Sequence, residues 1–273
     1  MKCMVCGGNL ASYFSKDFAG WCGLGLVHYQ RCGFCGLTVS KTHVEMPNEE
    51  WATVNHKYHS SYHGTGTTPD DPHWLSRLRA QYDNIKLLAA EGLLPRHASW
   101  IDYGCGDGKL ADMLGRSGLP VMKYDKYPSA GAGDYVGDEA LCKQYAVVLN
   151  TSVFEHVRSI AELDEIAGLV DSRGVFALHT LVCEEVPCDP DWFYLLPVHS
   201  AFFTNRSMQL LFERWEFKAS LYHVPSQMWF AYRDEAKAVA EFVARQHSGG
   251  SDDFHYKRGF VDYWKCEPRR TSN

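Results

Sequence analysis

Three glycines at alternate positions, Gly104, Gly106 and Gly108, constrain the fold of this chain more than any other feature. They follow the run Ser-Trp-Ile-Asp-Tyr at residues 99–103, which is typical of a short buried strand, and they precede a helical pattern that begins at Lys109. Glycine adopts positive φ angles without strain and lets a ligand approach the backbone, because it has no Cβ. The sequence therefore predicts a strand, a tight turn and a helix, either around a ligand or as an ordinary corner of an α/β fold.

A carboxylate near the end of this strand limits which ligand the turn can accept. Dinucleotide-binding proteins use the pattern G-x-G-x-x-G, in which the helix N-terminus faces a pyrophosphate. Here the third glycine comes one residue earlier, and Asp102 would repel a phosphate. An acid at this place suits a ligand that carries an ammonium and a sulfonium group. The pattern D-x-G-x-G-x-G over residues 102–108 resembles motif I of class I S-adenosylmethionine (SAM) methyltransferases.

The resemblance implies an α/β fold, namely a Rossmann-like SAM-methyltransferase sheet with helices on both faces. The alternation of strand and helix patterns along the chain agrees with it. The sequence departs from the family pattern at residues 129–138, which are shorter than the usual crossover, at Gln144, where an acid commonly opens the fourth strand, and at Ser152, which replaces an acid. Residues 46–72 are polar and loop-like. We expect strands at 120–125, 146–150, 173–181, 217–224 and 227–232, and helices at 73–92, 109–116, 160–170 and 234–246.

A second acid, Asp125, ends the next expected strand, 23 residues after Asp102. An acid about 20 residues after the glycine turn binds ribose hydroxyls in sheets of this kind, whereas the alternative role is a turn-forming aspartate before Lys126. The resemblance also implies that Asp138 lies near the adenine amino group. The donor-binding residues expected from motif and resemblance together are Asp102, Tyr103, Gly104, Cys105, Gly106, Asp125, Lys126, Asp138, Asn150 and Ser152.

Two further segments resemble the acceptor side of small-molecule methyltransferases. Residues 154–157, Phe-Glu-His-Val, are similar to a turn that follows the fourth strand, and residues 197–204 are similar to the P-x-H-x-x-x-F-T segment of zinc-ribbon sugar and natural-product methyltransferases. We expect His199 to be the general base, because an unperturbed histidine pKa near ~6.5 suits proton removal; the alternative is a histidine that caps the following helix. His156 and Glu155 are expected to assist, one facing the pocket and the other a structural partner.

Aromatic and histidine residues on two segments are candidates for contact with the acceptor. Tyr58 and Tyr62 match a Tyr-x3-Tyr spacing that precedes motif I in many such methyltransferases, where it folds over SAM. The histidines around them, His56, His59 and His63, are consistent with a substrate pocket, a second metal site or an exposed polar strip. The residues expected to bind substrate are Tyr58, Tyr62, His63, Trp192 and Tyr194.

Four cysteines near the N-terminus form two C-x-x-C pairs, each followed by glycine. Cys3 and Cys6 make the first pair and Cys32 and Cys35 the second, with 25 residues between the pairs. Two thiolates three residues apart can bind one tetrahedral ion, so the doubled motif predicts a zinc ribbon rather than a redox pair or scattered buried thiols. Four thiolates leave no open position for water, so the zinc is expected to be structural.

Composition narrows the class of protein further. The 273 residues carry a net charge of −6, which argues against nucleic acid as the main partner, and no apolar run approaches the ~20 residues of a membrane helix. The start lacks an apolar signal segment and the ten cysteines do not form a secreted disulfide pattern, so we expect a cytoplasmic protein. The expected domains are a zinc ribbon at 1–45, a linker and helical lid at 46–97, and the SAM-binding domain at 98–273.

Together these features predict a SAM-dependent methyltransferase that methylates an oxygen or carbon of a small polar molecule. A nucleotide-linked sugar or a natural-product intermediate is the expected kind of acceptor. Two alternatives stay open: a zinc-ribbon rRNA base methyltransferase, and a non-catalytic subunit of the same fold that docks a partner through its ribbon. The oligomeric state is not predicted.

Overall fold

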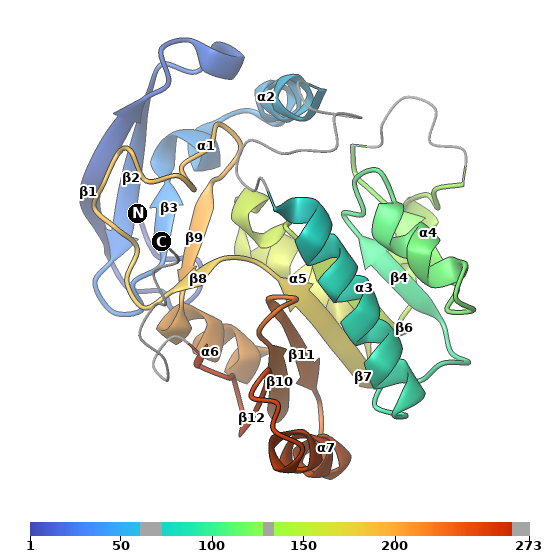
Figure 1. Cartoon of the computed structure of the whole chain (residues 1–273). Helices are drawn as coiled ribbons and strands as arrows, with labels where there is room; N and C mark the ends of the chain where they lie inside the picture. Colours follow the sequence, from blue (N-terminus) through green and yellow to red (C-terminus); the bar gives the residue numbers. More distant parts are fainter. Residues whose placement is uncertain (61–72, 128–133, 264–273) are drawn as a thin grey trace.

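The computed structural model describes residues 1–60, 73–127 and 134–263. Its larger sheet has seven strands in the order β12-β10-β11-β7-β6-β4-β5 (Figure 1). The four strands at one side are parallel, and the three at the other side pair antiparallel. In chain order the seven strands are β4 (Trp100–Tyr103), β5 (Val121–Tyr124), β6 (Tyr145–Thr151), β7 (Val170–His179), β10 (Ala219–His223), β11 (Met228–Tyr232) and β12 (Phe254–Arg258).

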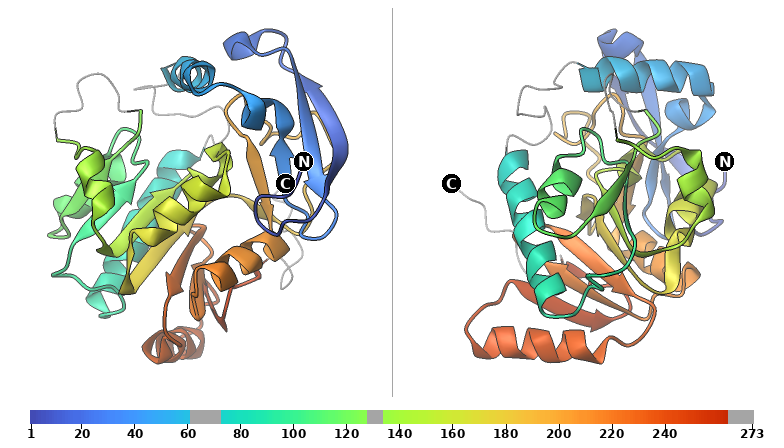
Figure 2. Two further views of the ribbon diagram at one scale, coloured as in Figure 1. Left: turned by 180° about the vertical axis from the view of Figure 1, so that it is seen from behind. Right: turned by 90° about the vertical axis from the view of Figure 1, so that its right-hand side faces the viewer.

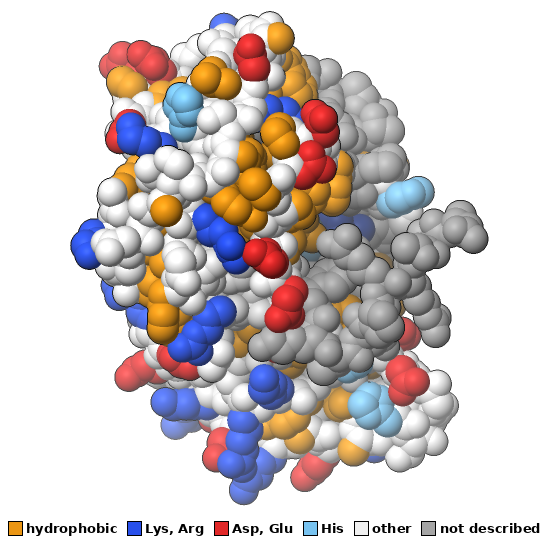
Figure 3. All heavy atoms as spheres, turned by 90° about the vertical axis from the view of Figure 1, so that its left-hand side faces the viewer, with side chains coloured by type: hydrophobic (Ala, Val, Ile, Leu, Met, Phe, Trp, Pro, Cys, Tyr) orange, Lys and Arg blue, Asp and Glu red, His pale blue; other side chains and the backbone are white. Residues whose placement is uncertain are grey.

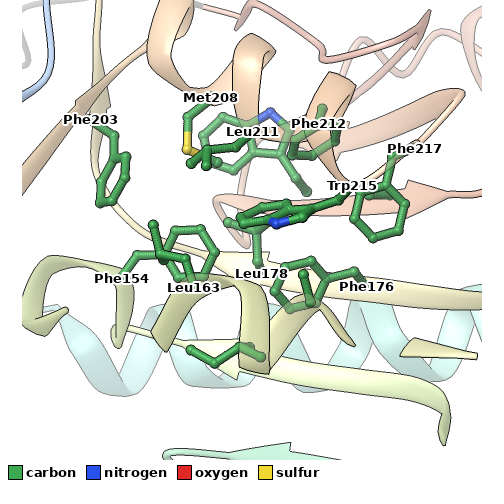
Figure 4. Close-up of a cluster of buried hydrophobic side chains, with 14 of the residues drawn as sticks. Phe154, Leu163, Phe176, Leu178, Phe203, Met208, Leu211, Phe212, Trp215 and Phe217 are labelled. Atoms are coloured by element: carbon green, nitrogen blue, oxygen red, sulfur yellow. The ribbon is translucent and has the colours of Figure 1, made fainter. Parts of the chain in front are cut away.

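Helices cover both faces of this sheet, because successive strand residues point to opposite faces and both sets are apolar. Trp100 packs with the helices of one face and Ile101 with those of the other. The first face carries α3 (Trp74–Ala90), α4 (Lys109–Gly115) and α7 (Lys237–Ser248), and the second carries α5 (Ile160–Gly168) and α6 (Asn205–Arg214). Figure 4 shows the aromatic cluster on the second face, where Trp215 and Phe176 meet between α6 and the sheet. The predicted α/β architecture is confirmed.

The crossover between β5 and β6 is short, as the sequence predicts. In the described part of this segment the chain makes an isolated parallel bridge between Lys123 and Tyr135 and a 3-10 helix, η2 (Asp138–Cys142). A parallel crossover usually contains an α-helix. In the described part of this crossover a 3-10 helix stands instead, and Tyr135 forms a single bridge beside β5.

A second sheet joins the N-terminal region to a later part of the chain, in the order β1-β2-β3-β9-β8 (Figures 1 and 2). Strand β3 pairs with β9 across more than 160 residues of sequence, through Thr38 with Phe202 and Val39 with Ala201. The predicted domain boundary at residue 45 stays a prediction. The strands of the second sheet are β1 (Leu10–Asp17), β2 (Leu26–Cys32), β3 (Thr38–Ser40), β8 (Val182–Cys183) and β9 (Ala201–Thr204). The N-terminal region also contains the short helices η1 (Trp21–Gly23) and α1 (Lys41–Glu45).

The outer face of this second sheet is seen in Figure 3. Lysine, arginine, aspartate and glutamate side chains are interspersed there with hydrophobic ones. Trp21, Leu26 and Phe34 are exposed on the N-terminal segment. None of the helices within 1–60, 73–127 and 134–263 combines the length and the apolar character needed to cross a bilayer.

One expectation about secondary structure is wrong. The segment 46–72 was expected to be loop-like, yet α2 occupies Asn48–Ser60. The burial of Trp51, Val54 and Tyr58 against the second sheet stabilises this helix, although its polar residues hide the pattern. One strand has no counterpart among the expected elements, namely β12, which pairs with β10 at the edge of the sheet. The remaining expected strands and helices of 73–127 and 134–248 are present.

Candidate active site

The glycine turn after β4 has the strained geometry that only glycine tolerates. Gly104 has φ +73°, and a Cβ there would lie 2.4 Å from Cγ2 of Val153. Gly108 has φ +72°, and a Cβ there would lie 2.6 Å from Cδ of Lys123. Gly106 differs, because a Cβ at this position would meet nothing within 4 Å. Two glycines thus allow close packing below the turn, and the third faces open space where a ligand can approach.

Two buried polar atoms beside the turn have no hydrogen-bond partner in the described part of the chain. They are Oδ1 of Asp102, a residue that is 1% exposed, and Oδ1 of Asn150, which is fully buried. The Asn150 amide is oriented by its Nδ2, which donates to the carbonyl of Tyr103 at 3.1 Å. Buried acceptors without donors are costly, so both atoms suit a ligand that brings N–H or cationic groups.

Burial, and after it the neighbouring Asp125 and Asp107 carboxylates, together raise the pKa of Asp102 to about 7. The charged form therefore lacks solvation, and no ion pair involves Asp102 within 1–60, 73–127 and 134–263. A cation next to Asp102 would reverse this effect. The group of residues 102–108 together with Asp125 and Asn150 is called the donor corner below.

Asp125 holds the glycine turn in place. Its Oδ2 accepts a hydrogen bond from the Gly106 amide at 2.8 Å, and its Oδ1 accepts one from the Tyr127 amide at 2.8 Å. The second bond is the turn-forming role that the sequence left as an alternative. The ribose-binding role stays a prediction, as does that of the exposed neighbour Lys126.

The short crossover after β5 packs against the donor corner. The Tyr135 hydroxyl donates to the carbonyl of Gly106 at 2.6 Å. Asp138 lies in the same segment and accepts a hydrogen bond from the Tyr124 hydroxyl at 3.0 Å. The structure therefore brings Asp138 to the strand-end side of β5, and its role toward adenine stays a prediction.

His179 is a polar residue that the sequence analysis did not single out, and it lies beside Ser152 at the end of β6. Ser152 has φ +58°, its amide donates to the carbonyl of His179, and its Oγ lies 3.1 Å from His179 Nδ1. His179 also lies 3.4 Å from Arg77 Nη1, and burial followed by the Arg77 charge holds its pKa well below the usual range. A polar residue at the carboxyl end of a predicted parallel strand was the signal that could have found it.

Glu155, His156 and His199 come together on the other side of this edge, and we call them the acceptor group. One ligand-type atom from each lies within 4.8 Å of the other two. Glu155 is buried against the Thr180 and Tyr194 hydroxyls whereas His156 is half-buried, and which of the two faces a substrate stays a prediction. The rings of His156 and His199 are 5.1 Å apart, and His59 of α2 lies 5.5 Å from His156.

The acceptor group is tied to its surroundings by hydrogen bonds. Glu155 is 1% exposed and accepts from the Tyr194 hydroxyl at 2.8 Å and the Thr180 hydroxyl at 2.9 Å. His199 is 2% exposed, and its Nδ1 lies 2.8 Å from the carbonyl of Tyr194. Burial and then the His156 charge hold the pKa of His199 well below its usual value, so the expected unperturbed pKa is wrong. Thr204 rather than His199 caps α6.

The residues expected to bind substrate fall into two sets. Tyr58, Trp192 and Tyr194 are 2%, 9% and 7% exposed and pack in the apolar core between α2 and the second sheet. Among them Tyr194 is closest to the acceptor group, with its ring centroid 4.4 Å from that of His199. Tyr62 and His63 lie outside the described residues. Contact of these residues with a substrate stays a prediction.

The four N-terminal cysteines converge into one cluster. The Sγ atoms of Cys3 and Cys35 are 3.6 Å apart, those of Cys6 and Cys32 are 3.4 Å apart, and those of Cys6 and Cys35 are 3.6 Å apart. Sulfur atoms around one tetrahedral Zn²⁺ lie about 3.8 Å apart, given bonds of about 2.3 Å, whereas a disulfide has about 2 Å. The donor set and spacing fit a closed four-thiolate site.

The two cysteine turns have the same backbone geometry. Gly7 and Gly36, which follow the second cysteine of each pair, have φ +71° and +74°. In each turn the glycine amide donates to the carbonyl of the pair's first cysteine, Cys3 at 2.9 Å and Cys32 at 3.0 Å. The expected need for glycine behind each pair is confirmed.

Comparison with known proteins identifies the family. A family model described as a methyltransferase domain matches residues 73–220, which is more than half of the 273 residues. A search of curated proteins finds no match.

Solved structures similar to this chain are methyltransferases. One is 1,6-didemethyltoxoflavin-N1-methyltransferase from Burkholderia thailandensis, with 16% identity, 76% of this chain and 93% of that chain covered, and a TM-score of 0.49. Another is magnesium protoporphyrin IX methyltransferase from Synechocystis, with 16% identity, coverage of 59% and 84%, and a TM-score of 0.41. On the match of the family model, the chain belongs to the SAM-dependent methyltransferases that contain this methyltransferase domain.

Proposed function

We propose that this protein transfers the methyl group of SAM to an oxygen or carbon atom of a small polar molecule. Nucleotide-linked sugars and natural-product intermediates are the proposed acceptor class. The observation that carries the proposal is the donor corner, where open space above Gly106 adjoins the buried, unpartnered oxygens of Asp102 and Asn150. When bound there, SAM supplies an electrophilic methyl group on a sulfonium.

The donor corner would bind SAM through charge and backbone approach. Asp102 and Asn150 would accept hydrogen bonds from its ammonium group, since both oxygens need donors. Asp125, already oriented by the Gly106 amide, would take the ribose hydroxyls. The other proposed donor contacts are Tyr103, Gly104, Cys105, Lys126, Asp138 and Ser152.

The acceptor group would hold the second substrate and manage its proton. Methyl transfer needs the acceptor atom in line with the methyl group and within near-attack distance. His199 and His156 present imidazoles toward one point, and Glu155 presents a carboxylate, so a hydroxyl or acidic carbon there would meet proton-accepting groups. Because burial lowers the pKa of His199, we assign proton removal to the acceptor group as a whole rather than to His199 as an isolated base.

The four-cysteine cluster is proposed to bind a structural Zn²⁺. The cluster packs against the methyltransferase core, since Cys3, Cys32 and Cys35 belong to the same buried group as α6. The Thr204 hydroxyl at the start of α6 donates to the carbonyl of Cys35. A bound ion would thereby fix β1–β3 on the side of the sheet that carries the acceptor group.

Titration calorimetry with S-adenosylhomocysteine tests the donor half of the proposal. We expect binding by the wild type and by His199→Ala, and a loss of at least tenfold in affinity for Asp102→Asn. A panel of hydroxylated small molecules, screened for raised melting temperature in the presence of S-adenosylhomocysteine, then tests the acceptor class. No binding by the wild type would refute the proposed function, and salt-dependent RNA binding with no response to small molecules would refute the acceptor class.

A further inference from the structure

The two histidines of the acceptor group are oriented alike. Nδ1 of His156 lies 2.9 Å from the carbonyl of Val198, and Nδ1 of His199 lies 2.8 Å from the carbonyl of Tyr194. A carbonyl only accepts, so each Nδ1 carries the hydrogen and donates it. In the neutral imidazole this leaves a lone pair on Nε2 of both rings. Histidines that bind metals through Nε2 show this same arrangement, with the other nitrogen bonded to a backbone carbonyl.

The carboxylate of the group is oriented as well. Each oxygen of Glu155 accepts one hydroxyl hydrogen bond, from Tyr194 or Thr180, and keeps a further lone pair. Glu155 is 1% exposed, and no ion pair involves it within the described part of the chain. A buried carboxylate that has only neutral donors around it is costly and favours a nearby cation.

We propose that Glu155, His156 and His199 form a second metal site, which binds a divalent first-row transition metal ion separately from the four cysteines. Two imidazoles and one carboxylate are a ligand set suited to such ions, with positions left open for water or substrate. One possible ligand atom from each residue lies within 4.8 Å of the other two. Around a tetrahedral ion with bonds of about 2.1 Å the ligand atoms would be about 3.4 Å apart, so binding would draw the side chains together.

This site deepens the proposed function and depends on it for the identity of the acceptor. An acceptor hydroxyl bound at an open position of the ion would have a lowered pKa, and its O–H bond would break with the proton passing to water. The oxygen would then form its bond to the methyl carbon as the carbon–sulfur bond of SAM breaks, leaving neutral S-adenosylhomocysteine. His156 and His199 would act as ligands. The competing arrangement is a proton in place of the ion, shared between Glu155 and a histidine.

Loading the 273-residue chain with Co²⁺ and measuring the bound metal per chain distinguishes these arrangements. We expect two ions in the wild type, one with the intense thiolate-to-cobalt absorption of the four-cysteine cluster and one without it. His199→Ala and Glu155→Gln should each retain the thiolate-bound ion and lose the other. The matched control is His97→Ala, an exposed histidine, which should keep both ions.

A milder substitution provides a test that still applies if the variants with buried substitutions do not fold. Tyr194→Phe keeps all three ligands and removes one hydroxyl bond to Glu155, so it should lower affinity for the second ion by about 10- to 100-fold and leave the first unchanged. A wild type that binds only the thiolate-bound ion would overturn the site, as would two ions retained in both His199→Ala and Glu155→Gln. S-adenosylhomocysteine binding, measured in the same samples, reports on the proposed function separately.

Discussion

The donor corner and the acceptor group lie at the same edge of one sheet but are assembled differently. The donor corner comes from a nearly continuous stretch, with Asp102 and the glycines at one strand end and Asp125 at the next. The acceptor group combines the turn after β6 with His199, and it is surrounded by α2 and by the second sheet. One half of the site depends on local backbone geometry, and the other depends on how distant segments pack.

This difference suggests that the strand ends around β4 and β5 determine binding of the methyl donor, whereas packing of distant segments determines binding of the acceptor. In the proposed function, backbone conformation and the two buried oxygens without donors, on Asp102 and Asn150, prepare the donor corner for SAM. In the acceptor group His199 precedes β9, which pairs with the N-terminal strand β3, and His156 lies beside His59 of α2. We therefore expect the N-terminal region to influence the acceptor more than the donor.

The sharpest separation of the two halves is expected from His199→Ala. Turnover on a true acceptor should fall by about 10² to 10⁴, the usual contribution of a group that manages the proton of the substrate. The dissociation constant of S-adenosylhomocysteine should change by less than about threefold, because His199 does not touch the donor corner. Steady-state kinetics and calorimetry on one preparation measure both. Equal losses in turnover and donor binding would break the comparison.

Loss of a cysteine ligand should give the next largest effect. Cys6→Ser would leave three thiolates and weaken the ion that fixes the N-terminal strands, at a cost of about 3 kcal/mol or roughly 6–12 °C in melting temperature. Cys142→Ser, at an exposed cysteine in η2, is the matched control and should change the melting temperature by less than about 1 °C. Differential scanning calorimetry measures the melting temperature of each variant, and zinc analysis measures its metal content. An unchanged melting temperature after complete zinc loss would contradict a structural role.

A methyl group at Gly104 should damage the donor half alone. Gly104→Ala forces Val153 to move and adopts a strained φ, so we expect affinity for S-adenosylhomocysteine to fall by about 30-fold or about 2 kcal/mol. Gly118→Ala has a similar φ of +78° with nothing within 4 Å of its Cβ, so it should lose about 1 kcal/mol of stability and keep donor affinity. Similar affinities for the two variants would show that packing under the turn does not shape the site.

A smaller effect concerns pH. Because the pKa of Asp102 is raised to about 7, its carboxylate gains charge between pH 6 and pH 8, and affinity for the cationic donor SAM should rise by up to about tenfold over this range. Asp102→Asn should give a flat and weaker profile in calorimetry. A wild-type affinity that falls with rising pH would contradict the assignment.

The raised pKa of Asp102 has the opposite effect on stability: as the pH rises, donor affinity should increase but the stability of the donor-free protein should decrease. A native pKa above the unfolded value of about 3.9 stabilises the fold at low pH and loses that contribution as pH rises toward 7. Without a bound donor, Asp102→Asn should therefore be more stable than the wild type at pH 8, by on the order of 1–2 kcal/mol in the free energy of unfolding, and should have a higher melting temperature. An equal or lower melting temperature would show that the buried charge is already compensated.

The sequence predicts the donor half well because its signals are local. Gly104 and Gly106 report backbone conformation directly, and Asp102 and Asp125 stand at strand ends that apolar runs define. The acceptor half is less predictable. The convergence of Glu155 and His156 with His199 joins segments that are distant in sequence. The pKa of His199 is lowered by burial and by histidines on other segments, His156 first among them.

The sequence did not predict α2 and β12, and the reasons are related. The buried face of α2 includes Asn55 as well as Trp51, Val54 and Tyr58, so its apolar pattern is weak without knowledge of the sheet it covers. In β12 only the first residue, Phe254, is buried, because the strand stands at the sheet edge. Partners that are distant in sequence decide both elements.

A crystal structure of the protein with S-adenosylhomocysteine tests the central claim most directly. The account predicts the ligand above Gly106, with its amino group at the oxygens of Asp102 and Asn150, its ribose hydroxyls at Asp125, and its sulfur facing the acceptor group. A ligand bound elsewhere, with both orphan oxygens still without donors, would contradict it.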